Sequence, residues 1–262
     1  MIDWLVRTPF AHRGLHGPDT GPENSLPAFA AAVAHGFGIE CDVRLLADDA
    51  VVVFHDRDLA RLTGRPGALG ALRTEDLATL FLRDSLEHPP LLPELLRLVA
   101  GRVPLYIELK TDAKPSQHLV RRVLECLRGY GGPCCLASFD PRALAWVARL
   151  DPTRPRCLIA TKFTDAAMPR WKRFAYSNLL QAVLARPHCI SYDLRALPKW
   201  IVAALRRAGL PVLVWTVRTR QDRKRAFDFG DNIVFEGWIP PSPANTEGAG
   251  SHGHAPGTTK ES

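Results

Sequence analysis

The stretch that decides the fold is Gly38–Asp56, which reads GIECDVRLLADDAVVVFHD. Two strand-like runs, Gly38–Val43 and Val51–Phe54, are separated chiefly by the turn residues Ala47–Ala50. A connection this short fits an antiparallel hairpin, whereas a parallel crossover needs about a dozen residues or more. We therefore interpret Val51–Phe54 as an excursion from the strand before it.

Outside this hairpin, strand-like runs alternate with helical patterns along the chain. Setting the excursion aside leaves eight strands, which predicts an α/β fold, a (β/α)8 or TIM barrel. The predicted strands are Thr8–Arg13, Gly38–Val43, Pro104–Lys110, Cys134–Phe139, Arg156–Ala160, His188–Asp193, Pro211–Val217 and Asp231–Glu236. The predicted helices are Ser25–His35, with Asn24 as its N-cap, Gln117–Tyr130, Pro141–Leu150, Trp171–Leu184, Pro198–Ala208 and Thr219–Phe229.

The length of 262 residues and the hydrophobic content of 46% suit a single large core. We expect residues 1–240 to form one barrel domain, with an insertion at about 56–90 over its mouth and a short helix around Glu75–Phe81. Residues 241–262 are rich in Pro, Gly, Ser and Thr, so we expect a disordered tail.

Composition narrows the class of protein. The six cysteines show no paired metal-ligand spacing, which favours buried free thiols. No apolar run approaches about 18 residues and the first residues lack a secretory pattern, so we expect a cytoplasmic protein without membrane insertion. The net charge of +7 attracts anions, nucleic acid included. Because the basic cluster falls largely on predicted outer helices, a solvated face is favoured over nucleic-acid binding.

Polar side chains follow the ends of the early strands, where barrels of this kind carry their active sites. Residues two apart on a strand point to the same face, about 6.6–6.8 Å apart along it. Pairs of polar side chains therefore project together into the barrel mouth. The set is His12, Arg13, Glu40, Asp42, His55, Glu108 and Lys110.

Three of these side chains, Glu40, Asp42 and Glu108, are carboxylates on adjacent strand ends. Ionised carboxylates crowd a partly buried site only when a cation or hydrogen bonds offset their repulsion. Hard oxygen ligands favour Mg²⁺ or Ca²⁺ over zinc. The alternative is that each carboxylate pairs with a neighbouring Arg or Lys, but three together favour a metal site.

Arg13 and Lys110 would make the same pocket positive and suited to a phosphate group. Phosphodiester cleavage needs one proton removed and another delivered, and two histidines can do both. His12 and His55 fit that requirement because they lie beside the carboxylates. The other histidines that we expect to be structural are His16, His35, His88, His118 and His188.

Several strings, in order and spacing, resemble the glycerophosphodiester phosphodiesterase family over about residues 8–239: AHRG, GPENSLPAF, GIECDVRL, VVVFHDRDL, LTG, LPELL before YIELK, ASFD and VWTVRT. The resemblance implies metal-dependent hydrolysis of glycerophosphodiesters to glycerol 3-phosphate and an alcohol. It implies a divalent cation on Glu40, Asp42 and Glu108, and acid–base work by His12 and His55, with His12 as the base.

The resemblance also covers less certain positions. Glu23 and Asn24 match a Pro-Glu-Asn element at the first helix start, where simple capping is the alternative. Trp215 matches an aromatic residue that would pack against the substrate alcohol, with burial in the core as the alternative. The last strand reads IVFEGWIP where the family has an Asp-containing element, so Glu236 and Trp238 are expected to alter substrate fit rather than the reaction.

Two other functions stay open. One is a lysophospholipase D activity on single-chain lipids, for which Trp171, Phe174, Tyr176, Leu179 and Leu180 would form an interfacial surface. An outer helix that packs inward explains the same pattern better. The other is a non-catalytic barrel that binds anionic headgroups, although paired acid and base side chains argue against it. The head-group alcohol, the metal, the nucleophile and the oligomeric state stay open.

Overall fold

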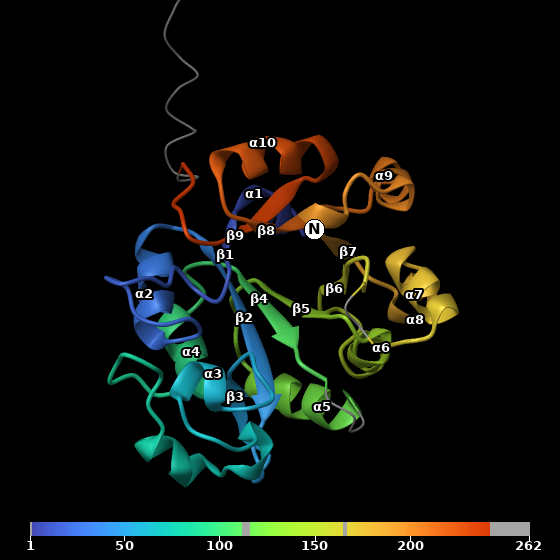
Figure 1. Cartoon of the computed structure of the whole chain (residues 1–262). Helices are drawn as coiled ribbons and strands as arrows, with labels where there is room; N and C mark the ends of the chain where they lie inside the picture. The colour runs from blue at the N-terminus through green and yellow to red at the C-terminus, as the bar shows by residue number, and fades with distance from the viewer. Residues whose placement is uncertain (1, 112–115, 165–166, 242–262) are drawn as a thin grey trace, which may run out of the picture.

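Eight parallel strands close into a barrel in the computed structural model, which describes residues 2–111, 116–164 and 167–241 (Figure 1). Strand β1 pairs with both β2 and β9, so the sheet has no open edge there. The predicted TIM barrel is confirmed. The barrel strands are β1 (Phe10–Ala11), β2 (Gly38–Leu45), β4 (Leu105–Leu109), β5 (Cys134–Ser138), β6 (Arg156–Ala160), β7 (Cys189–Asp193), β8 (Val212–Val217) and β9 (Asn232–Phe235).

The predicted hairpin is also present. Strand β3 (Val51–Val53) runs antiparallel to β2 and pairs with Val43–Leu45, whereas β4 pairs with the earlier residues of β2. The insertion that follows contains α3 (Ala60–Thr63) and two 3₁₀ segments, η1 (Leu69–Ala71) and η2 (Thr74–Thr79). It has a small core of its own, formed by Leu46, Val52, Phe54, Leu59, Leu62, Leu69, Leu77, Leu80 and Leu82.

Helices cover the outside of the barrel (Figure 1). They are α2 (Leu26–Ala34), α4 (Leu92–Val99), α5 (Ser116–Cys126), α6 (Pro141–Leu150), α7 (Arg170–Ser177), α8 (Ala182–Ala185), α9 (Trp200–Arg207) and α10 (Arg220–Phe229), with η3 (Leu194–Ala196) before α9. The short helix α1 (Trp4–Arg7) packs Leu5 against the barrel interior. The sequence analysis did not predict helices α1 and α4. None of the described helices is long and apolar enough to cross a bilayer.

Alternation along the strands separates two cores. In β2, Ile39, Cys41 and Val43 join the large core between barrel and helices, so Glu40 and Asp42 point into the barrel. Below them the interior is filled with side chains, and the site is therefore a mouth rather than a pore. These interior residues are Phe10, Tyr106, Cys135, Ala137, Cys157, Ile159, Cys189, Leu213 and Val234. All six cysteines are free, and all but Cys126 are buried.

Two local predictions are wrong. The N-cap of α2 is Ser25, whose hydroxyl accepts from the Ala28 amide at 3.4 Å, and Asn24 is engaged elsewhere. The predicted helix Trp171–Leu184 breaks near Leu179 into α7 and α8. It packs inward only in part: Leu179 is buried and Tyr176 is half-buried, but Trp171 and Phe174 are 74% and 64% exposed. The short helix predicted around Glu75–Phe81 is present as the 3₁₀ segment η2. The predicted tail, residues 241–262, lies outside the described residues except for residue 241.

Gly14 follows the first strand and links the site to the fold. Its φ is +82°, and an added Cβ would lie 2.9 Å from a ring carbon of Phe29 and 3.0 Å from the Ala28 Cβ. Gly129 has a similar φ of +78°, but no atom lies within 4 Å of an added Cβ. The two glycines therefore separate the effect of packing from that of backbone conformation.

We predict that Gly14→Ala lowers the free energy of unfolding by about 2–4 kcal/mol, because it adds a steric clash to the strain of a positive φ. Gly129→Ala should cost only about 1 kcal/mol, because it has the strain alone. Urea unfolding monitored by circular dichroism measures both values. Equal losses in the two variants would contradict the packing of Gly14 described above.

Candidate active site

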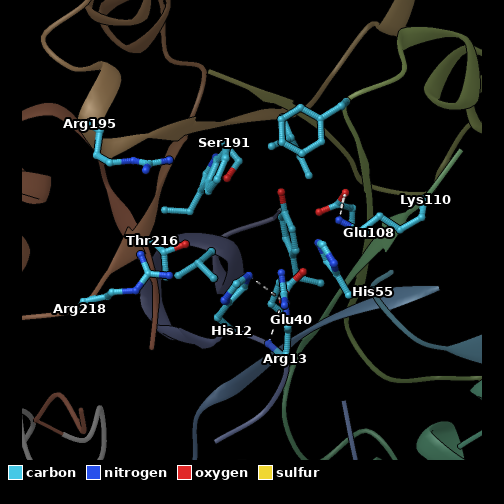
Figure 2. A pocket seen from close by; sticks show the side chains of 15 residues that line it. His12, Arg13, Glu40, His55, Glu108, Lys110, Ser191, Arg195, Thr216 and Arg218 are labelled. Carbon is cyan, nitrogen blue, oxygen red and sulfur yellow. Dashed lines mark hydrogen bonds and ion pairs between the residues drawn. The ribbon is translucent and has the colours of Figure 1, made fainter. Parts of the chain in front are cut away.

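A cavity of ≈ 330 Å³ opens at the carboxyl ends of the barrel strands (Figure 2). Six of the seven residues predicted from the strand ends line it, and the seventh, Asp42, is 1% exposed and contacts two of them. The lining residues are His12, Arg13, Glu40, His55, Tyr106, Glu108, Lys110, Phe139, Ile159, Ser191, Arg195, Trp215, Thr216, Arg218 and Val234.

Three buried carboxylates converge beside the cavity. One oxygen from each of Glu40, Asp42 and Glu108 lies within 4.8 Å of the others, and Asp42 and Glu108 are direct neighbours across β2 and β4. Burial, together with the charges of the other two carboxylates, raises the pKa of Glu40 well above its ordinary value. Burial likewise raises the pKa of Glu108. Such a cluster of hard oxygen donors fits a divalent cation.

Two cations balance this cluster in the structure. Lys110 Nζ lies 2.7 Å from Glu108 Oε1 and 3.0 Å from Asp42 Oδ1, and Arg13 Nε lies 3.4 Å from Asp42 Oδ2. Burial alone would raise the pKa of Asp42, but Lys110 and Arg13 hold it well below its usual range. The ion pairs that the sequence offers as an alternative to a metal are therefore present: Arg13 pairs with Asp42, and Lys110 pairs with Asp42 and Glu108.

The chain turns sharply at Arg13 to make these contacts. Its φ is +57°, in the left-handed region that residues with a Cβ seldom adopt. In this conformation the Arg13 amide donates to Glu40 Oε2 at 2.9 Å, while its guanidinium reaches Asp42. Backbone strain at a residue that contacts two of the clustered carboxylates is typical of a functional site.

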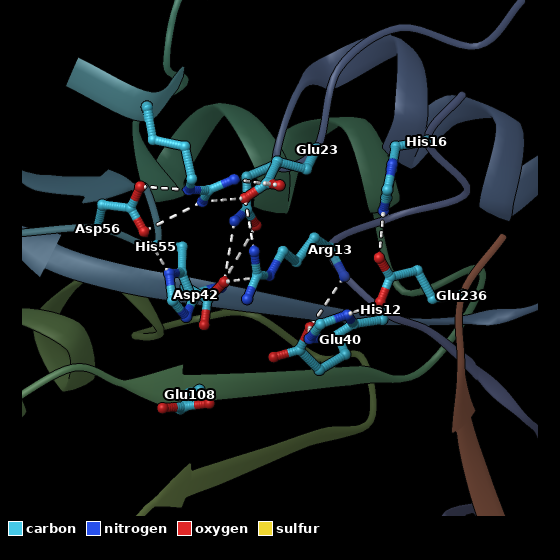
Figure 3. A network of polar contacts seen from close by, with 12 residues as sticks. His12, Arg13, His16, Glu23, Glu40, Asp42, His55, Asp56, Glu108 and Glu236 are labelled. Carbon is cyan, nitrogen blue, oxygen red and sulfur yellow. Dashed lines mark hydrogen bonds and ion pairs between the residues drawn. The ribbon is translucent and has the colours of Figure 1, made fainter. Parts of the chain in front are cut away.

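Glu23 and Asn24 do not line the cavity but contact residues of the site, as Figure 3 shows for Glu23 and Arg13. The Asn24 amide donates to Asp42 Oδ2 at 2.9 Å, and Glu23 Oε1 accepts from Arg13 Nη1 at 2.7 Å. Neither side chain caps a helix. Both hold residues of the site in place, so neither the predicted pocket contact nor the capping alternative describes them.

His12 is held by a residue from the other end of the sequence. Its Nδ1 lies 3.0 Å from Glu236 Oε2, and its Nε2 lies 3.9 Å from Glu40 Oε2. Arg218 also donates to Glu236 Oε2, at 2.8 Å. The hydrogen bond with His12, aided by the nearby charges of His12 and Arg218, lowers the pKa of Glu236 to about 2 although burial opposes the shift. The prediction that Glu236 alters substrate fit finds no support in this contact, because Glu236 holds a histidine and does not line the cavity.

His55 has a matching carboxylate partner. Its Nδ1 lies 2.6 Å from Asp56 Oδ1, and Arg61 of the insertion donates to Asp56 Oδ2 at 2.6 Å and to Glu23 (Figure 3). Burial, aided by the charges of Lys110 and Arg13, lowers the pKa of His55 below its ordinary value. The sequence prediction omitted Asp56 and Arg61. Asp56 was recognisable as the neighbour of His55, but no pattern pointed to Arg61.

The two tryptophans differ in position. Trp215 lines the cavity and meets the Phe139 ring edge to face, with ring centroids 5.7 Å apart. Trp238 does not line it, and its indole donates to the Val217 carbonyl at 3.1 Å. Among the histidines expected to be structural, His16 lies 3.9 Å from Glu236 Oε1, and hydrogen-bonding or ionic partners within 3.2 Å are present for His35, His88, His118 and His188.

Comparison with known proteins agrees with this geometry. A glycerophosphodiester phosphodiesterase of Bacillus subtilis is 28% identical over 253 residues, which cover 86% of this chain and 81% of that protein. A human lysophospholipase D is 25% identical over 84% of this chain and 80% of its own length. A phosphodiesterase of Oleispira antarctica, solved with its product sn-glycerol-3-phosphate, superposes with a TM-score of 0.76 at 22% identity, over 90% and 94% of the two chains.

The model of the glycerophosphoryl diester phosphodiesterase family matches residues 12–235, which span the barrel from His12 to the last strand. This match and the site geometry lead to the same conclusion: the chain belongs to the glycerophosphoryl diester phosphodiesterase family.

Proposed function

We propose that this chain hydrolyses glycerophosphodiesters to glycerol 3-phosphate and an alcohol, with a divalent cation. One observation carries the proposal: a single cavity joins a buried three-carboxylate cluster, two cationic side chains and two histidines. Each histidine also has a carboxylate at Nδ1. A module that only binds anionic headgroups needs no such pair of oriented proton carriers.

Glu40, Asp42 and Glu108 would hold the cation, Mg²⁺ or Ca²⁺. Their oxygens are hard donors, they are buried, and their mutual repulsion favours a bound positive charge. When bound, such an ion offsets the charge of the phosphodiester and of the transition state. The cation would add to the compensation of carboxylate charge that Lys110 provides.

Arg13 and Lys110 would then bind the phosphate. Both line the cavity, and both are cationic at neutral pH because the carboxylates around them raise the pKa of each group in spite of burial. Arg13 offers a planar fork of donors, whereas Lys110 acts as a compact charge. Together they orient the phosphodiester and stabilise the extra negative charge of the transition state.

His12 and His55 would move the protons. A carboxylate at Nδ1 favours the tautomer with its proton there, which leaves Nε2 of each ring to exchange a proton with the substrate. We assign His12 as the base that deprotonates the nucleophile and His55 as the acid that protonates the departing alcohol. The nucleophile is either water or the neighbouring glycerol hydroxyl. Attack by water needs one such pair of proton transfers, whereas attack by the hydroxyl forms a cyclic phosphate that water opens with a second pair. Trp215 and Phe139 would pack against the alcohol.

A second candidate is hydrolysis of single-chain lipids by the same chemistry. It is favoured by the exposure of Trp171 and Phe174 and by the resemblance to a human protein named as a lysophospholipase D. Glycerophosphocholine and a lysophospholipid, compared with Mg²⁺ and Ca²⁺ in turn, separate the two substrate classes.

We predict that His12→Ala and His55→Ala each lower turnover of glycerophosphocholine by at least about 10²-fold, because each removes one proton carrier. Release of glycerol 3-phosphate measures turnover. His35→Ala is the matched control, because His35 is exposed at the end of α2 and does not line the cavity. Near-normal turnover in either site variant would refute the acid–base assignment.

Metal removal provides a second prediction. Treatment with a chelator should abolish turnover, and Mg²⁺ or Ca²⁺ should restore it. Calorimetric titration should detect binding of one divalent ion that Asp42→Asn weakens by at least about tenfold, because one of three charged ligands is lost. The control is Glu75→Gln, whose carboxylate is exposed on the insertion. Unchanged ion affinity in Asp42→Asn would place the metal elsewhere.

Glu236 gives a pH-dependent prediction. Its folded pKa of about 2 lies below its ordinary value of 4.5, so its stabilising effect is present above pH 4.5 and is lost as the pH falls towards 2. Glu236→Gln should cost on the order of 2 kcal/mol of unfolding free energy at pH 6, after allowance for partial exposure, and much less near the folded pKa.

The same variant tests the role of Glu236 in orienting His12. Turnover should fall by about 10-fold or more with little change in KM, because the substrate cavity does not include Glu236. Glu236→Asp, which keeps the charge, should recover part of the loss. A loss confined to KM, or a stability difference that does not depend on pH, would contradict the assignment.

A further inference from the structure

One side of the barrel exposes an unusual number of large apolar side chains. Of the eleven exposed large hydrophobic residues in the described part of the chain, six fall between residues 171 and 200, on α7, α8, the turn between them and the start of α9 (Figure 1). We call these six residues the apolar face: Trp171 (74% exposed), Phe174 (64%), Leu180 (56%), Val183 (87%), Leu184 (52%) and Trp200 (70%).

The packing of this segment is inverted relative to an ordinary outer helix. Leu179 is the one large apolar side chain of residues 171–185 that is buried, together with the small or polar Ser177, Asn178 and Ala185, whereas Phe174 and Val183 face outward. The inward contacts are specific, since the Tyr192 hydroxyl donates to the Ser177 carbonyl at 2.7 Å. A helix that only covers a barrel buries its large side chains and exposes its small polar ones. The apolar face therefore has the character of a binding surface for a partner outside the barrel.

Residues 167–210, which include the apolar face, carry a net charge equal to that of the whole protein. Residues 167–210 contain eight Lys and Arg residues and one acidic residue, Asp193, a net charge of +7. The rest of the chain then holds 26 of the 34 basic and 26 of the 27 acidic residues, which balance. The basic residues of the segment are Arg170, Lys172, Arg173, Arg186, Arg195, Lys199, Arg206 and Arg207.

Part of the apolar face borders the catalytic mouth. Helices α7 and α9 follow β6 and β7, so both begin at the carboxyl ends of the strands, and Trp171 and Trp200 lie in their first turns. A hollow of ≈ 390 Å³ is lined by Lys162 and Phe163 of the loop after β6, and the Phe163 ring meets Tyr176 of α7 edge to face at 5.9 Å. It shares Arg195 and Trp215 with the active-site cavity.

We propose that the apolar face binds the surface of anionic lipid assemblies. Aromatic and aliphatic side chains would enter the boundary between headgroups and acyl chains, while the surrounding basic side chains contact anionic headgroups. A second copy of the chain is disfavoured as the occupant, because two faces of this charge repel each other. A nucleic acid would use the charge but gains little from exposed Val183 and Leu184.

Lipid binding by this face rests on its own geometry. Its consequence for substrate rests on the proposed function, because the catalytic cavity would open close to the bound surface. The enzyme would then draw substrates from lipid surfaces, such as glycerophosphodiesters that retain one acyl chain. Association would be peripheral, in keeping with the lack of a membrane-spanning helix among the described residues.

Sedimentation of the full chain with vesicles tests the proposal. The chain should bind vesicles of phosphatidylcholine with about 30% phosphatidylglycerol more tightly than vesicles of phosphatidylcholine alone, and added salt should weaken this binding. The double variant Trp171→Ser/Phe174→Ser should bind at least about tenfold more weakly, because it removes two aromatic side chains from the interface. Arg170→Gln should weaken binding to the anionic vesicles only.

The matched control is Phe81→Ser/Leu86→Ser, which removes two exposed apolar side chains from the insertion, and it should bind vesicles like the unmodified chain. All variants should hydrolyse glycerophosphocholine at the unmodified rate, which shows that they are folded. If the unmodified chain does not hydrolyse glycerophosphocholine, the proposed function is refuted, but lipid binding by the apolar face is not.

Three outcomes would overturn the lipid proposal. The first is equal vesicle binding by Trp171→Ser/Phe174→Ser and the unmodified chain. The second is a dimer in solution that this variant dissociates, which would assign the face to a second copy. The third is binding to a DNA duplex that competes with vesicles and is insensitive to the two aromatic substitutions.

Discussion

The repulsion among three buried carboxylates is the constraint on which the site depends. Glu40, Asp42 and Glu108 bring their oxygens within 4.8 Å of one another in a place from which water is largely excluded. Such an arrangement persists only if positive charge and hydrogen-bond donors surround it. The left-handed turn at Arg13 and the buried position of Lys110 supply that charge. The charge of the cluster is thus balanced by neighbouring protein cations, and its three oxygens are close enough together to hold a divalent ion.

Features set by local periodicity could be predicted from the sequence. The two-residue period of β2 places Glu40 and Asp42 on one face, and the short turn Ala47–Ala50 requires the hairpin. The N-cap of α2 could not be predicted reliably, because Asn24 and Ser25 are both good capping residues. Only the tertiary structure decides between them, since Asp42 binds the Asn24 amide and leaves Ser25 to cap the helix.

The partners of His12 and His55 mark the limit of what the sequence predicts. Glu236 is 224 positions from His12, and only closure of the barrel between β1 and β9 brings them to 3.0 Å. The sequence shows that Glu236 departs from the family pattern. It does not show that Glu236 contacts His12, because the register of the strands decides which side chains meet. Asp56 is adjacent to His55 in sequence, yet its second partner, Arg61, comes from an irregular insertion. Neither contact follows from residue type or spacing.

The distribution of charge separates the chemistry of the site from the basic character of the chain. At the mouth, Arg13 and Lys110 are matched by buried carboxylates, so these cations contribute no excess charge outside the cavity. The whole excess of +7 lies on residues 167–210. Solvation explains exposed lysine and arginine, but it does not explain Trp171 and Trp200 exposed among them. An anionic lipid surface would account for both features, because its headgroups attract basic side chains and its acyl chains accept apolar ones.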